Sequence, residues 1–303
     1  MYLTGIADEA GAAIDVQIKA TKELGWTCLE ARNAQVADFP TANLHDIPDA
    51  AFKLAVDKLG QAGVKVCCFS STIANWGKKI NEPFDSSLAE ARRAIPRMQR
   101  LGTKYIRIMS FAVRENHADQ MEAERFRRLR ELTRMFLDAG LQPVHENCMN
   151  YGGMGWPFAL KLLENVPGLK WAFDTGNPLL NLDRSRPKPW PRQDPWEFYR
   201  HVKPFIAHVH VKDAAWDVAR NEAVYTFPGE GQGQVRRILK DLLAGGYDGG
   251  ISIEPHMAVV FHDASVTAAA AAQYANYVEY GRRLGKLVAG IQRELQPSVC
   301  AGV

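Results

Sequence analysis

Short apolar runs alternate with longer amphipathic segments along the whole chain. A glycine closes many of the amphipathic segments, and an apolar run begins one or two residues later, as at Gly25, Gly63 and Gly102. Glycine readily adopts the left-handed conformation that ends a helix, so these positions predict short turns from helix to strand. Between residues 119 and 139, apolar residues spaced three to five apart would share one face of a helix. The pattern therefore predicts strands that alternate with amphipathic helices.

The alternation repeats eight times, beginning at Tyr2. Strands that alternate with helices pair in parallel through right-handed crossovers, and eight such units are typical of a closed barrel. No linker-like stretch or shift in composition divides the sequence. We therefore predict the α/β class, with residues 1–303 forming a single (β/α)8 TIM barrel domain. The final helix is expected to begin near Val266, so that residues 267–303 hold this helix and the tail.

The long connections of the predicted barrel follow strands and not helices. They cover residues 32–47, 72–84, 175–193 and 213–231. In this fold the segments after the strands form the C-terminal face, where active sites lie. The last of these connections ends with Phe-Pro-Gly-Glu-Gly and is expected to form a lid or rim of the site.

Four polar residues end the last four predicted strands: Glu146, Asp174, His210 and Glu254. Side chains alternate along a strand, and next to Asp174 and Glu254 the larger apolar residues occupy the opposite face, which suits packing against helices. Polar residues share the face of His210, and Val144 shares the face of Glu146. The four side chains would then point into the mouth of the barrel. Unrelated, solvated strand ends are the alternative, but a shared orientation on four successive strands argues against it. Three carboxylates and one imidazole suit a single, fairly hard, six-coordinate divalent ion.

Composition narrows the class of protein. The formal net charge is 37 − 34 = +3, too small to predict a nucleic-acid or membrane surface. Neither an apolar stretch long enough to span a bilayer nor a signal peptide is visible, which predicts a cytoplasmic protein. The odd number of cysteines and the lack of a C-x-x-C motif predict reduced thiols. These cysteines are Cys28, Cys67, Cys68, Cys148 and Cys300.

Three further residues are candidates for substrate binding. Lys212 would point into the mouth, although an ion pair with Glu30 or Asp213 is the alternative. His208 shares the face of His210 one layer deeper, where it could contact substrate, orient a ligand or be a satisfied core histidine. Glu30 ends the second predicted strand at the same rim. A nearby histidine, at position 256, could support the site or be solvated.

Several motifs together resemble those of the xylose isomerase-like barrels, and more narrowly of the sugar phosphate isomerase/epimerase group. They are His145-Glu146-Asn147, Asp174-Thr175-Gly176-Asn177, His208-Val209-His210-Val211-Lys212-Asp213, Ile253-Glu254-Pro255-His256 and Gly229-Glu230-Gly231. The resemblance implies one divalent ion held by Glu146, Asp174, His210 and Glu254. Mn2+ is the expected ion, with Co2+, Mg2+ and Zn2+ as possibilities, and no organic cofactor is expected. It further implies a small sugar or keto-sugar substrate and a homo-oligomer of the kind this family often forms.

The resemblance also implies a reaction. In the family's ketose epimerases one glutamate removes a proton next to the carbonyl and the other returns it to the opposite face, through an enediolate that the metal stabilises. Glu146 and Glu254 match those catalytic positions. Asn177, Gly152 and Trp216 stand where those epimerases carry His, Glu and Arg, so the substrate is expected to differ from a free ketohexose. The predicted activity is a metal-dependent sugar isomerase or epimerase.

Two other activities fit the same motifs. A lyase that dehydrates a keto-inositol or cleaves a 3-keto-glycoside or C-glycoside would share the metal and the first proton abstraction. A sugar-binding barrel without catalysis is the third possibility, although it would not need two opposed glutamates. The lack of histidine at the corresponding positions, together with the small net charge, argues against a three-metal DNA-repair nuclease of the wider family. Those positions hold Ser70, Ser71, Met109, Ser110 and Asn177.

Overall fold

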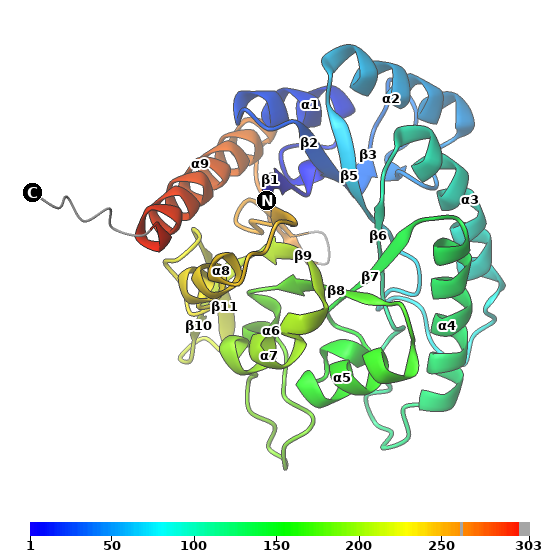
Figure 1. Cartoon of the computed structure of the whole chain (residues 1–303), viewed down its shortest axis with the longest axis vertical. Coiled ribbons are helices and arrows are strands. Elements are labelled where there is room, and N and C mark those ends of the chain that lie inside the picture. Colours follow the sequence, from blue (N-terminus) through cyan, green and yellow to red (C-terminus); the bar gives the residue numbers. More distant parts are fainter. Residues whose placement is uncertain (261–262, 297–303) are drawn as a thin grey trace, which may run out of the picture.

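The computed structural model describes residues 1–260 and 263–296, and it confirms a single parallel barrel with helices between the strands. Figure 1 shows the strands ringed by helices. The barrel strands follow one another in the order β1-β12-β9-β8-β7-β6-β5-β2. Their bounds are β1 (Tyr2–Gly5), β2 (Cys28–Ala31), β5 (Lys65–Ser70), β6 (Tyr105–Ile108), β7 (Gln142–Glu146), β8 (Lys170–Asp174), β9 (Ile206–Val211) and β12 (Gly250–Ile253).

The barrel closes between β1 and β2 through much less backbone pairing than elsewhere. Neighbouring strands around the rest of the barrel share a ladder, as β12 does with both β1 and β9. Between β1 and β2 the structure has one isolated parallel bridge, which joins Ile6 and Glu30. The hydroxyl of Thr4 adds a 2.9 Å hydrogen bond to the carbonyl of Cys28. Side chains therefore help to close the barrel where the backbone ladder is weakest.

Amphipathic helices cover the outside of the barrel, as the sequence pattern predicts. In α4, the residues Phe126, Leu129, Leu132 and Phe136 are buried against the strands. No described helix has the length and apolarity that a membrane span requires. The helices are α1 (Ile14–Glu23), α2 (Asp49–Ala62), α3 (Asp85–Leu101), α4 (Glu122–Asp138), α5 (Trp156–Asn165), α6 (Asn177–Leu180), α7 (Pro195–Val202), α8 (Val235–Ala244) and α9 (Ala270–Leu295).

Strand register places the predicted site residues side by side. Asp174 in β8 stands opposite His210 in β9, and His210 in turn stands opposite Ser252 in β12. The alternate residues Trp171 and Phe173 point outward, where both rings pack against Phe198 of α7. The alternation of large apolar and small or polar residues thus separates a dry outer layer from a polar lumen.

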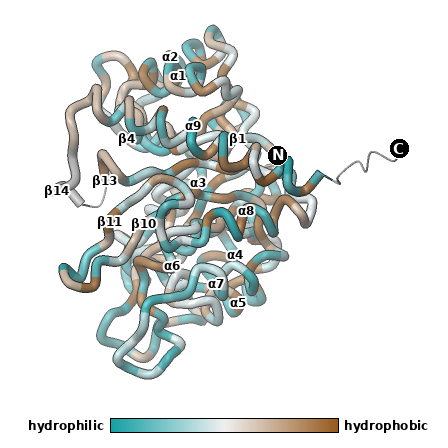
Figure 2. The backbone as a smooth tube through the Cα atoms, turned by 90° about the vertical axis from the view of Figure 1, so that its left-hand side faces the viewer, coloured by the Kyte–Doolittle hydropathy of each residue, from teal (hydrophilic) through white to brown (hydrophobic). Residues whose placement is uncertain are grey.

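Short hairpins elaborate three of the C-terminal connections. Figure 2 shows β10, β11, β13 and β14 together on one side of the molecule. The predicted lid segment forms the antiparallel pair β10 (Asp213–Asp217) and β11 (Glu222–Thr226). The two smaller pairs are β3 (Asn33–Ala34) with β4 (Ala42–Asn43) and β13 (Val259–Val260) with β14 (Asp263–Thr267).

Two sequence expectations need correction or fall outside the structure. The final helix begins at Ala270 and not near Val266, because the extended strand β14 occupies Asp263–Thr267. Four of the five cysteines are free thiols, as expected, and Cys300 lies outside the described residues together with the rest of the tail.

Candidate metal and active site at the mouth of the barrel

The structure brings the four predicted metal ligands into one cluster. Ligand atoms of Glu146, Asp174, His210 and Glu254 all lie within 4.8 Å of one another, and all four residues are buried. Glu146 and Asp174 are the last residues of β7 and β8, His210 lies in β9, and Glu254 directly follows β12. The parallel strands therefore deliver each side chain to the same end of the lumen.

Part of each ligand's polar capacity is already used by the protein, and part is not. Asp174 Oδ1 accepts hydrogen bonds from the backbone N–H groups of Gly176 and Asn177, at 2.8 and 2.7 Å. Asp174 Oδ2, His210 Nδ1 and Glu254 Oε2 are buried and make no hydrogen bond with any residue that the structure describes, although the Lys212 ammonium forms ion pairs with the two carboxylate oxygens. Buried polar atoms rarely stay unsatisfied, and these three atoms face one another in one cluster. The donor set therefore fits a divalent metal ion.

Glu30 lies beneath this cluster and holds its histidine. The Nε2 atom of His210 lies 3.0 Å from Glu30 Oε1, and the Nε2 atom of His208 lies 2.7 Å from Glu30 Oε2. Ser70 also donates to Glu30 Oε1. A carboxylate only accepts hydrogen bonds, so both imidazoles carry a proton at Nε2, and Nδ1 is the atom of His210 that is left for a metal.

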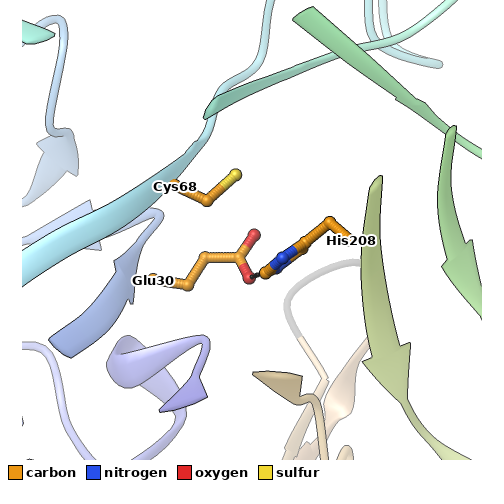
Figure 3. A group of neighbouring side chains, drawn as sticks. All are labelled: Glu30, Cys68 and His208. Atoms are coloured by element: carbon orange, nitrogen blue, oxygen red, sulfur yellow. Dashed lines mark hydrogen bonds and ion pairs between the residues drawn. The ribbon is translucent and has the colours of Figure 1, made fainter. Parts of the chain in front are cut away.

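Figure 3 shows Glu30, Cys68 and His208 pointing toward one another from three different strands. Their ligand atoms form a second close cluster, one layer deeper than the first. Neither Glu30 nor His208 is among the residues that line the cavity above. The substrate contact predicted for these two residues stays untested, while the structure gives Glu30 a direct contact with His210.

Lys212 lies at the centre of the mouth. Its ammonium is 2.9 Å from Glu254 Oε2 and 3.3 Å from Asp174 Oδ2, and it donates a 3.2 Å hydrogen bond to Asn177 Oδ1. The alternative of an ion pair with Glu30 or Asp213 is wrong. Asp213 accepts hydrogen bonds from the backbone of the glycine-rich turn instead, at Gly229, Gly231 and Gly233.

Two buried arginines complete the site, and the sequence analysis missed both. Arg107 in β6 donates to Glu146 Oε2 at 2.7 Å. Arg32, just after β2, donates to Glu254 Oε1 at 2.9 Å and also pairs with Asp8 and Glu9. The signal for Arg107 was available, because it alternates with two isoleucines and stands opposite an inward-facing position of β7. Arg32 follows its strand in a loop, where alternation gives no such signal.

Glu9 links the first connection of the barrel to the last. It accepts a 2.9 Å hydrogen bond from the backbone N–H of His256, and His256 Nδ1 lies 2.8 Å from Glu9 Oε1. The side chain of His256 is buried, so the interpretation as a solvated residue is wrong. His256 therefore helps to hold in place the segment that carries Glu254, two positions earlier in the chain.

These contacts separate the pKa values of the carboxyl groups. Burial acts to raise the pKa of Glu146, but Arg107 and His210 outweigh it and lower that pKa to about 2. Burial is opposed in the same way at Glu254, where Lys212 is the main cation and the pKa lies well below its usual range. At Asp174 burial prevails over Lys212, with help from the two glutamates, and raises the pKa to about 7.

A cavity of about 390 Å3 opens above the cluster on the C-terminal face. Glu146, Glu254 and Lys212 line it, so two of the four candidate ligands border the cavity, while Asp174 and His210 lie behind them. Aromatic side chains from two connections, among them Trp76 and Trp216, form part of its wall. Pockets of this size, with apolar walls and a few convergent polar groups, are typical of small-molecule sites.

Comparison with known families agrees with this architecture. A family model described as "xylose isomerase-like TIM barrel" matches residues 18–282. The chain belongs to this family. The match covers every site residue from Glu30 to Glu254. No curated protein matches the sequence.

Solved structures of similar fold cover nearly the whole chain. A xylose isomerase domain protein from Planctomyces limnophilus has a TM-score of 0.69 at 16% identity and covers 97% of each chain. A xylose isomerase-like TIM barrel protein from Mycobacterium smegmatis, in complex with magnesium, has a TM-score of 0.66 at 18% identity, over 95% of this chain and 97% of that one. A D-tagatose 3-epimerase-like protein has a TM-score of 0.68 at 16% identity, over 97% and 100%. At these identities the likeness establishes the fold.

Proposed function

We propose that this protein is a divalent-metal-dependent sugar isomerase or epimerase that abstracts a proton from the carbon next to a carbonyl group. The observation that carries the proposal is the cluster of Glu146, Asp174, His210 and Glu254 at the base of a solvent-accessible cavity. The D-tagatose 3-epimerase-like protein among the similar structures supports this class of reaction.

The four clustered residues would hold the metal ion, and three of their buried atoms lack any other hydrogen-bonding partner among the described residues. Oxygen-rich ligation favours Mn2+ or Mg2+, and the similar structure from Mycobacterium smegmatis contains magnesium. When bound, such an ion acts as a Lewis acid toward the oxygens of a carbonyl substrate.

Glu146 and Glu254 would exchange the substrate proton. They come from strands on different sides of the cluster, on β7 and after β12, so they can address a substrate from two directions. Arg107 and Arg32 each orient one oxygen of a glutamate. Arg107 and Lys212 are the main cations that keep Glu146 and Glu254 ionised, as a general base requires. Lys212 would bind a substrate oxygen in the same mouth.

A lyase is the second candidate, because proton abstraction next to a carbonyl is also the first step of a β-elimination. The three departures at Asn177, Gly152 and Trp216 favour a substrate other than a free ketohexose. A probable 3-DHS dehydratase from Bacillus anthracis is also among the similar structures, at 16% identity. The mass of the product separates the two reactions, since an elimination loses a group and an isomerisation does not.

The test combines metal content with proton exchange. Protein loaded with Mn2+ is expected to hold about one ion per chain, and the Glu254→Gln variant is expected to keep the fold and lose turnover. Keto-sugars incubated in deuterated water should gain deuterium next to the carbonyl with the wild-type protein alone. A fully active Glu254→Gln variant would contradict the acid/base assignment, and a protein that takes up no ion at any loading would favour a sugar-binding barrel.

A further inference from the structure

Arg192 differs from the other cations of the cavity because no carboxylate in the described part of the chain balances it. It lies in the connection between β8 and α7 and lines the cavity above the metal cluster. Among the side chains that the structure describes, it makes no ion pair at 4.0 Å or less. Its guanidinium donates to the carbonyl of Leu180 and stacks on the ring of Trp216, 3.2 Å from the ring centre.

Each of the other cavity cations has an acidic partner. Lys212 pairs with Asp174 and Glu254, and Arg107 pairs with Glu146. Arg32 pairs with three carboxylates, of Asp8, Glu9 and Glu254. These contacts organise the carboxylates proposed to react, whereas Arg192 contacts an aromatic ring and a backbone carbonyl and pairs with no acidic side chain among the described residues.

The surroundings of Arg192 hold its charge in a fixed place. Trp216 belongs to the hairpin β10–β11, and Leu180 ends α6, so two separate connections position the guanidinium. Burial lowers the pKa of Arg192, and none of the acidic groups that the structure describes offsets that effect. A stacked guanidinium with free donors is the arrangement that proteins use for bidentate recognition of carboxylates and phosphates.

The position of Arg192 separates it from the reacting centre. It also lines an adjoining hollow of about 310 Å3, which shares Met149, Leu180 and Asn181 with the main cavity and holds none of the four clustered ligands. A substrate whose carbonyl end reaches Glu146 and Glu254 could therefore place another substituent beside Arg192.

We propose that Arg192 binds an anionic group of the substrate, a carboxylate or a phosphate ester, at a distance from the carbons that react. The substrate class is then an anionic keto-sugar and not a neutral one. This inference rests on the proposed function of the same cavity and adds the chemical group that its outer part recognises.

The test compares one neutral and two anionic probes on protein loaded with Mg2+. The probes are D-fructose, D-fructose 6-phosphate and 2-keto-D-gluconate, and their dissociation constants are measured by calorimetry at constant ionic strength. At least one anionic probe is expected to bind about tenfold more tightly than D-fructose, because a hydrogen bond to a charged group is worth that much or more. The phosphate and carboxylate probes show which anion the site prefers.

Arg192→Met should abolish this preference, so that the anionic probes bind no more tightly than D-fructose does to the same variant, and Arg192→Lys should keep only part of the preference. Arg186→Met is the matched control. It removes the same charge from the same connection, but Arg186 pairs with Asp183 and Glu197 and does not line the cavity. The control should keep the full preference.

The proposal is overturned if neither anionic probe is preferred, if neither binds, or if the preference survives in Arg192→Met. Metal content, measured on the same samples, separates this outcome from a failure of the proposed function. One ion per chain without any anion preference overturns the role of Arg192 alone. The protein could also take up no metal and still prefer anions in a way that depends on Arg192. That result supports the anion site and contradicts the metal-dependent reaction.

Discussion

Replacing Glu30 by glutamine tests whether this residue positions a metal ligand or contacts the substrate. Glu30 is fully buried and accepts hydrogen bonds on both oxygens, from His210 and Ser70 on one and from His208 on the other. Glutamine keeps one accepting oxygen and turns an amide nitrogen toward the other set of donors. It also removes the negative charge that makes the His210 imidazole a better ligand.

The expected loss is in metal affinity. Changes of this kind, to the carboxylate that holds a metal-ligating histidine, weaken metal binding by about 10- to 100-fold. That range corresponds to roughly 1.4–2.7 kcal/mol of binding free energy. The hydrogen bond from His210 Nε2, at 3.0 Å, is the contact through which the effect is transmitted.

Calorimetric titration of chelator-treated Glu30→Gln with Mn2+ gives the dissociation constant directly. Ser70→Ala is the matched control, because it removes a donor to the same oxygen without changing the charge or touching His210. It should bind the ion as the wild type does, and circular dichroism verifies that both variants are folded. Unchanged metal affinity in Glu30→Gln, together with a raised KM, would refute this reasoning and favour direct contact with substrate.

Three other predictions concern pH, charge pairing and packing. The carboxyl of Asp174, with a pKa near 7, must lose its proton to bind an ion. Metal affinity measured between pH 5.5 and 7 should therefore fall about tenfold for each unit by which the pH is lowered. A metal affinity that does not change with pH would contradict this. Arg107→Met leaves Glu146 without its arginine partner and should cost about 3–5 kcal/mol in urea unfolding, whereas no loss would show that the pair is not stabilising. In Gly5→Ala the new methyl group would lie 2.2 Å from the hydroxyl of Tyr277, so thermal unfolding should show a loss of about 1–3 kcal/mol; a wild-type midpoint would mean that α9 can move away.

Much of the fold could be predicted from the sequence because its determinants are local. Gly63 and Gly102 end α2 and α3 in the left-handed conformation, each with φ of 66°, as the recurring glycines predict. Alternation within β8 and β9 fixes which residues point into the lumen, and it predicts that Asp174 and His210 share one cluster.

The remainder of the site could not be predicted, because it depends on contacts between distant parts of the chain. Arg32 reaches Glu254 across 222 positions of sequence, and Glu9 reaches His256 across 247. No periodicity connects such residues, and their side chains extend from loops whose course the sequence pattern does not fix. The same holds for Arg192, whose stacking on Trp216 depends on how the hairpin β10–β11 folds back over the mouth.

The single backbone bridge between β1 and β2 gives the buried network a second role. Glu30 stands at that bridge, and its hydrogen bonds cross the lumen to His208 and His210 on β9. Two strands, β1 and β12, lie between β2 and β9 across this weakly paired part of the barrel. Among the barrel strands, amide hydrogen exchange should therefore be fastest where β1 meets β2. A bound ion should slow this exchange, because it stabilises the hydrogen bonds between Glu30 and the two histidines. The Glu30 carboxylate both holds the metal ligand His210 and helps to close the barrel. A substitution of Glu30 would therefore weaken metal binding and barrel closure together. Sequence changes in the outer connections, in contrast, can alter which substrate binds without affecting either.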